Sequence, residues 1–231
     1  MIYDTCMDLN RRLICGESVS SAEKSAFADG VLRAVCSTEE ANRFYTGVRY
    51  PGNCDNRGNR MYPFFLIPPY NGGNKLPTVT GLLPKTHILS ANSYEIEMLS
   101  MARRFAAETS HPFLPELNRM HEATLLRLKT TCYGTMDDGI GECFDASLLV
   151  LRYLAQEEPR HRTWIRSRIA NYRRHVHEKR RPPAVQWYFR LCLTELPAEQ
   201  VRDEIALELP FITPTGNPLY NAIGQKLTAM R

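Results

Sequence analysis

Apolar residues recur at every third or fourth position along most of this chain, which is the spacing of one face of an α-helix. The first such run extends from Tyr3 to Cys15 and is followed by Gly16, a residue type that commonly ends helices. Ser20 and Glu23 then stand at the spacing of a capping box, which predicts the start of a second helix. The pattern predicts a mainly α protein, built as an antiparallel helical-hairpin bundle or a short solenoid-like array.

Capping residues and prolines divide the rest of the pattern into further helices. A second capping box, Ser37 with Glu40, opens a short one, and Asn92 with Glu95 opens a longer one. Prolines at helix starts and ends, together with the apolar spacing, predict six more helices, near 115–128, 141–156, 159–181, 183–196, 197–209 and 218–230. Because Leu148–Leu151 is wholly apolar, we expect 141–156 to be the central, mostly buried helix.

The stretch from Gly47 to Asn92 interrupts this helical pattern. It is rich in proline, glycine and asparagine, and it contains three short runs typical of β-strands, Phe64–Ile67, Val79–Leu83 and Thr86–Leu89. Its many aromatic residues argue against disorder. We therefore expect an ordered, irregular insertion, with short strands, packed on the helices.

Length and composition fit a single domain over residues 1–231, with N-terminal helices in 1–46, the insertion in 47–92 and a helical core in 93–231. The purely apolar runs are far shorter than the roughly 20 residues that span a bilayer. The first residues have neither the basic nor the apolar region of a secretion signal. We expect a cytoplasmic protein that does not associate with membranes.

The seven cysteines are odd in number and include no Cys-x-x-Cys pair, so a disulfide framework or a zinc knuckle is disfavoured. Most are expected to be small core residues in a reducing compartment. His175 and His177 are two apart and would face different sides of a helix, which does not suit chelation. We expect no metal site and no cofactor.

The most distinctive local feature is the basic amphipathic helix predicted for residues 160–181. It carries nine Arg/Lys and three His against the single acid Glu178, whereas the whole chain has a net charge of only +4. One interpretation is an ordinary surface helix whose arginines pair with acids on neighbouring helices, such as Glu204. The other is a surface that attracts an anionic partner.

The insertion is also predominantly positive, so the two segments together would form an electropositive face with aromatic side chains. Loops held on a rigid scaffold are common positions for binding residues. We expect the chain to be a binding or interaction protein that holds an acidic protein or another anionic ligand. The predicted binding residues are Arg49, Arg57, Arg60, Lys85, Arg166, Arg173, Tyr62 and Tyr70.

Two alternatives remain open at this point. The helix at 160–181 could track the phosphates of a nucleic acid, although the sequence contains no recognised nucleic-acid-binding module. Alternatively, Cys143, in the first turn of the predicted central helix, could be the nucleophile of a hydrolase, because a helix N-terminus lowers a thiol pKa. Glu142 and Asp145 oppose that effect, and the sequence does not identify a histidine partner, so whether the protein is an enzyme stays open.

Overall fold

The computed structural model describes residues 2–35, 76–83, 87–129, 134, 142–178 and 182–231. Within these residues the chain forms nine α-helices and no strand, and 78% of it is helical. The prediction of a mainly α protein is therefore confirmed. The helices are α1 (Ile2–Ile14), α2 (Ser21–Arg33), α4 (His87–Glu108), α5 (Leu114–Leu128), α7 (Glu142–Ala155), α8 (Glu158–Glu178), α9 (Pro183–Thr194), α10 (Ala198–Glu208) and α11 (Pro218–Ala229), with the short 3-10 helix η2 (Leu209–Phe211) after α10.

The ends of α1 and α2 follow the local signals of the sequence. Gly16 has a φ of +79°, a left-handed conformation that glycine adopts without steric cost, and it ends α1. Ser20 Oγ accepts a hydrogen bond from the Glu23 amide, while a Glu23 carboxylate oxygen accepts one from the Ser20 amide. The predicted capping box is confirmed, and it satisfies backbone donors that have no partner within the helix.

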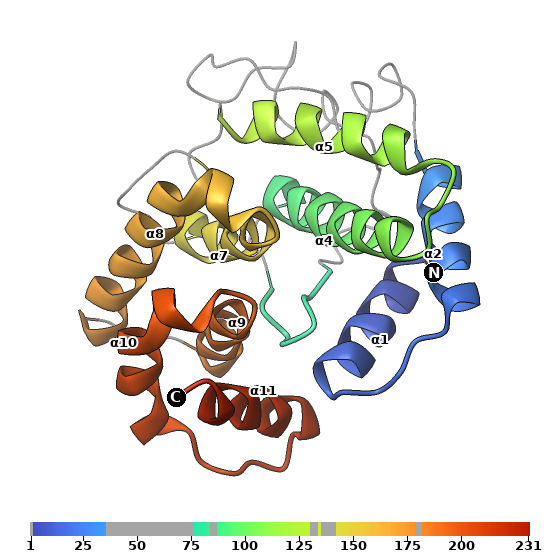
Figure 1. The fold of residues 1–231 in the computed structure, drawn as a ribbon. Helices are drawn as coiled ribbons and strands as arrows, with labels where there is room; N and C mark the ends of the chain where they lie inside the picture. Colours follow the sequence, from blue (N-terminus) through green and yellow to red (C-terminus); the bar gives the residue numbers. More distant parts are fainter. Residues whose placement is uncertain (1, 36–75, 84–86, 130–133, 135–141, 179–181) are drawn as a thin grey trace.

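The helices form a bundle around α4 and α7 (Figure 1). Helix α4 packs against α1, α2, α5 and α7, and α7 packs in turn against α8 and α9. Helix α9 also contacts α10 and α11, so it links the centre of the bundle to the C-terminal helices. No helix in the described part of the chain combines the length and apolar character needed to span a membrane.

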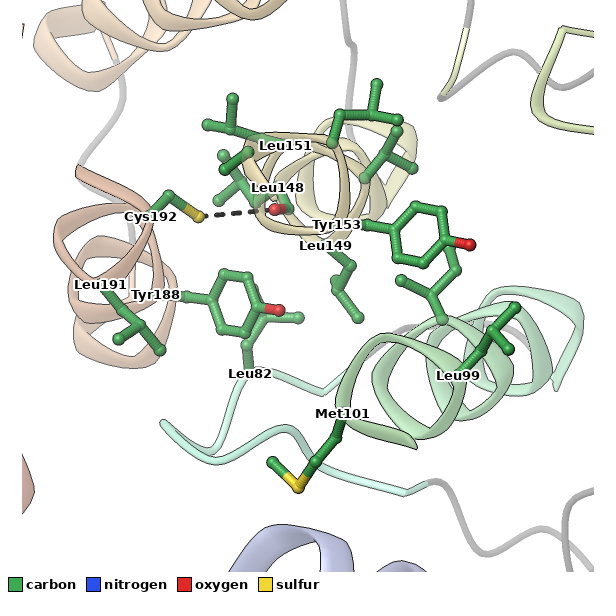
Figure 2. Close-up of a cluster of buried hydrophobic side chains, with 14 of the residues drawn as sticks. Leu82, Leu99, Met101, Leu148, Leu149, Leu151, Tyr153, Tyr188, Leu191 and Cys192 are labelled. Carbon is green, nitrogen blue, oxygen red and sulfur yellow. Dashed lines mark hydrogen bonds between the residues drawn. The ribbon is translucent and has the colours of Figure 1, made fainter. Parts of the chain in front are cut away.

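The apolar run on α7 lies at the centre of the core, as the sequence predicts (Figure 2). Leu148 and Leu151 are fully buried, and Leu148 accepts a hydrogen bond through its carbonyl oxygen from the thiol of Cys192 on α9, at 3.5 Å. Residues 76–83 cross the middle of the molecule, where Leu82 is 1% exposed. Tyr3 on α1 donates to the carbonyl of Pro77, so this non-helical segment is held by the helices around it.

Two expectations about the insertion are wrong where the structure describes it. Helix α4 begins at His87, so residues 87–92 are helical and the β-like run ending at Leu89 is not a strand. Residues 79–83 are also not a strand: they form a turn in which the Thr78 amide donates to the Leu82 carbonyl and Gly81 has a φ of +83°. Thr80 also bonds the helices around it: its hydroxyl group donates to the Ala184 carbonyl, and its own carbonyl accepts from the Tyr220 hydroxyl. Residues 36–75, including the run at 64–67 and the capping box at 37–40, lie outside the described residues.

Candidate functional site

A cavity of about 900 Å³ opens between the C-terminal helices α8, α9, α10 and α11. Its walls combine aromatic rings, two arginines, two glutamates and short polar side chains. The lining residues on which the argument below depends are Arg173, Trp187, Arg190, Glu204, Leu207, Glu208, Phe211 and Tyr220. This mixture of apolar walls and a few charged groups is typical of a binding site.

The back of the cavity is built on Trp187 and Tyr220, whose rings stack with centroids 4.7 Å apart and planes 12° apart. Tyr220 is oriented by its hydroxyl group, which donates to the Thr80 carbonyl at 2.9 Å. The guanidinium of Arg190 lies over the Trp187 ring, 4.6 Å from its centroid. Trp187 thus lies between a ring and a cation, and both contacts stabilise its position.

Arg190 is a charged group of this cavity whose side chain is held in place by burial and by its neighbours. Its side chain is only 5% exposed, and its Nε donates to a carboxylate oxygen of Glu208 at 2.8 Å. Among the described residues, neither terminal nitrogen of Arg190 donates a hydrogen bond to a protein group. Arg190 lines the cavity, so these two nitrogens are available to donate to an acceptor that a ligand brings there.

The second arginine of the cavity, Arg173, comes from α8 and is one of the predicted binding residues. Its Nε donates to Glu204 of α10 at 2.9 Å, and a terminal nitrogen forms a second bond to the same carboxylate. Burial raises the pKa of Glu204, and the bond from Arg173 opposes that effect. If residues 160–181 form an ordinary surface helix, its arginines are expected to pair with acids on neighbouring helices. The bond between Arg173 and Glu204 is one such pair.

Other cations of α8 are also engaged with carboxylates. Arg160 bonds both carboxylate oxygens of Glu122 on α5, at 2.8 and 3.0 Å, and Arg162 bonds Glu158 one turn earlier at 2.7 Å. The contact with Arg160 lowers the pKa of Glu122. Since exposed ion pairs offset much of the field of their charges, the positive potential of α8 is smaller than its composition indicates.

The remaining predicted residues are not brought to the cavity. Arg166 is exposed on α8 and does not line it. Cys143 is the second residue of α7, in the first turn as expected, but its side chain is not among those that the structure describes. Six predicted binding residues, Arg49, Arg57, Arg60, Tyr62, Tyr70 and Lys85, fall outside the described residues, so the joint electropositive face stays a prediction.

Sequence reasoning missed Trp187, Arg190, Phe211 and Tyr220. One signal was present: α9 is an apolar helix in which Arg190 is the only charged residue. An arginine at such a position must find partners inside the protein or hold a ligand. By contrast, nothing in the local sequence links Tyr220 on α11 to Trp187, because their contact depends on how the two helices pack.

In the parts of the chain with described positions, no group of three His, Cys, Asp or Glu residues is arranged to hold a metal ion. The fold and the cavity together define a helical protein with a buried arginine at the wall of an aromatic cavity. Compared with known proteins, the chain matches no protein-family model, no curated protein and no solved structure.

Proposed function

We propose that this protein is a binding protein whose C-terminal cavity holds an anionic group of its ligand through Arg190. The observation that carries this proposal is the 5% exposed Arg190 side chain, whose terminal nitrogens donate to no other described residue. A carboxylate or phosphate oxygen accepts two parallel N–H bonds from a guanidinium, a geometry that is both strong and directional.

The surroundings of Arg190 support an anion more than a neutral ligand. Trp187 covers one face of the guanidinium, and Glu208 fixes its Nε, so the side chain loses little additional freedom on binding. In addition, Asn217 caps the N-terminus of α11 beside the cavity, and helix N-termini favour negative charge. Arg173 also lines the cavity, where it is paired with Glu204.

A cytoplasmic location is part of this proposal. The thiols of Cys6, Cys15 and Cys192 are free, which is compatible with a reducing compartment. Nucleic-acid binding by α8 receives less support, because Arg160, Arg162 and Arg173 are already bonded to glutamates. Hydrolysis by Cys143 stays a hypothesis, because the structure does not describe the side chain of this residue.

The test is the effect of simple anions on thermal unfolding, with inorganic phosphate and glutarate as probes and sodium chloride at matched ionic strength as the blank. A ligand that binds only the folded state raises Tm. We expect the rise in the wild type to disappear in Arg190→Met and to persist in Arg119→Met, a control at an arginine that is 77% exposed on α5. An equal rise in Arg190→Met would refute the proposal.

A further inference from the structure

We infer that a cluster of charged and titratable side chains forms an acid-sensitive latch, which holds α5 over an apolar cavity at neutral pH and releases it locally at mildly acidic pH. This device is independent of the C-terminal cavity. Three features carry it: the packing of α5, two histidines placed around one carboxylate, and the balance of charge. The latch residues are Arg103 on α4, His121 and Glu122 on α5, Glu157 in the turn after α7, and Arg160 and His161 on α8.

Helix α5 packs mainly on α4 among the described helices, and a cavity of about 830 Å³ separates it from α7 and α8 (Figure 1). The apolar part of the lining comes from all three helices and includes Leu125, Leu128, Leu154 and Trp164. Glu122, Arg160 and His161 line the same cavity, as does the exposed Lys129. Because side chains across a cavity lose their van der Waals contacts, the polar contacts of the latch matter more for holding α5 in place.

Glu157 brings α4, α5 and α8 together. Its Oε1 accepts a hydrogen bond from Arg103 at 2.8 Å and lies 3.0 Å from Nε2 of His121. Its Oε2 accepts from Arg160 at 3.3 Å and lies 3.8 Å from Nε2 of His161. Two arginines and two histidines therefore surround one carboxylate group.

The neutral form of His121 suits this position. The residue is 1% exposed, and its Nδ1 lies 2.5 Å from the Tyr153 hydroxyl group of α7. With its proton on Nε2, the ring faces Glu157 with a donor and Tyr153 with an acceptor. A second proton, on Nδ1, would meet the hydrogen of that hydroxyl group, which would then have to turn and accept. One turn further along α5, Thr124 donates to the buried Glu95 of α4 at 3.1 Å, a contact that needs no histidine.

The charges of the latch balance only while both histidines are neutral. Its two arginines are matched by Glu122 and Glu157, whose pKa values are lowered, so both carboxylates stay ionised at mildly acidic pH. Protonation of His121 and His161 would therefore leave two positive charges without a matching acid. Burial, and then the charge of a latch arginine, lower the pKa of each of these histidines.

Opening of α5 would bring both rings into water, where they take up protons below about pH 6.5. Because their pKa is lower in the closed form, the histidines favour closure fully above that pH and lose this contribution as the pH falls. Each proton taken up on opening raises the opening constant by up to about tenfold per pH unit. The latch therefore weakens over the range in which the folded bundle still holds its other helices.

The experiment is hydrogen–deuterium exchange of the full chain, read by mass spectrometry at about pH 7.5 and about pH 5.5 and corrected for the intrinsic effect of pH on exchange. We expect the protection of amides in α5 to fall about tenfold, through an opening that low urea hardly affects because it exposes little surface. Amides in α11 should exchange through a larger opening that urea promotes. If α5 and α11 show the same protection and the same urea dependence, or if the protection of α5 does not change with pH, the inference is overturned.

Arg103→Gln separates the effect of charge from a structural role. Without this cation His121 accepts a proton more readily in the closed form, so the fall in protection should shrink to about threefold. A purely structural role would lower protection equally at both pH values and keep the tenfold ratio. Arg104→Gln is the matched control, since this neighbouring side chain is 52% exposed and bonds Glu108, and it should keep the full ratio.

His121→Gln should remove most of the fall in the protection of α5, because glutamine does not titrate. Since His121 is buried, the Arg103→Gln variant and the wild-type profile decide the question if this variant does not fold. A full tenfold fall in Arg103→Gln, or in folded His121→Gln, would overturn the inference.

Discussion

At the scale of single residues, Arg152, whose side chain is 13% exposed, and Arg190, at 5%, show how the molecule compensates charge inside the bundle. Arg152 on α7 bonds both carboxylate oxygens of Glu195, and its terminal nitrogens also reach Asn10 and Glu97. Its charge is therefore compensated within the bundle, as buried ions require. Arg190 is less exposed, and among the residues with described positions it bonds Glu208 alone, through its Nε. The contrast between the two arginines is the reason that the cavity, rather than the Arg152 cluster, is the candidate site.

A buried histidine makes stability depend on pH. His121 is 1% exposed, its Nδ1 lies 2.5 Å from the Tyr153 hydroxyl, and its Nε2 lies 3.0 Å from a Glu157 carboxylate oxygen. Burial, and then the charge of Arg103, lower the pKa of His121. As the pH falls, His121 takes up a proton in the unfolded state before it does so in the folded state. The contribution of neutral His121 to the free energy of unfolding is therefore complete above about pH 6.5 and is lost as the pH falls below that value.

We expect the free energy of unfolding in urea to drop as the pH is lowered from about 8 to about 5.5, and most of this drop to vanish in His121→Gln. Glu157 does not titrate in this range, because its pKa is lowered to about 2. Burial also lowers the pKa of His161, so His161→Gln is the comparison variant and should keep the larger part of the drop. An unchanged pH dependence in His121→Gln would contradict this assignment.

At the scale of elements, most helices on the described residues follow local rules closely. Helix α4 is the exception, because it begins at His87 and not at the predicted capping box of Asn92 and Glu95. The predicted runs at 141–156 and 183–196 correspond to α7 (Glu142–Ala155) and α9 (Pro183–Thr194). The helix predicted to begin at Pro159 begins one residue earlier, since α8 starts at Glu158 and has Pro159 in its first turn. Local signals fix these ends because caps, glycines and prolines act within one helical turn.

Gly16 offers a direct test of this local control. A Cβ added there meets nothing within 4 Å, so the cost of Gly16→Ala comes only from its φ of +79°. We expect a loss of about 1 kcal/mol in the free energy of unfolding, measured in urea. Gly216 is the matched control: it also has open space around its Cβ position, but its φ is not in the left-handed region. Gly216→Ala should be neutral or slightly stabilising, and equal losses at both positions would exclude a conformational cause.

At the scale of the whole molecule, buried side chains from α1 to α11 form one hydrophobic cluster. A single domain over residues 1–231 stays a prediction, and the cluster is the physical reason to expect one cooperative transition. The two tryptophans, Trp164 on α8 and Trp187 on α9, report on the C-terminal helices, whereas far-UV circular dichroism reports on all helices.

We expect the two signals to give coincident unfolding curves in urea. Leu148→Ala, at a fully buried position of α7, should move both to lower urea together and cost about 2–5 kcal/mol. The exposed Leu126, at 43%, gives the control Leu126→Ala, with a much smaller cost. Separate transitions for fluorescence and circular dichroism would show that the chain contains more than one cooperative unit.

The sequence by itself determined the helical class, the central position of Leu148–Leu151 and most helix ends on the described residues, because these depend on periodicity and on capping within one turn. It could not determine the state of Val79–Leu83, which pairs with no strand among the described residues and is bonded instead to α9 and α11 through Thr80. Nor could it find the cavity. The stacking of Tyr220 on Trp187 and the limited partnering of Arg190 arise only when α8, α9, α10 and α11 pack together, since those contacts join residues far apart in the chain.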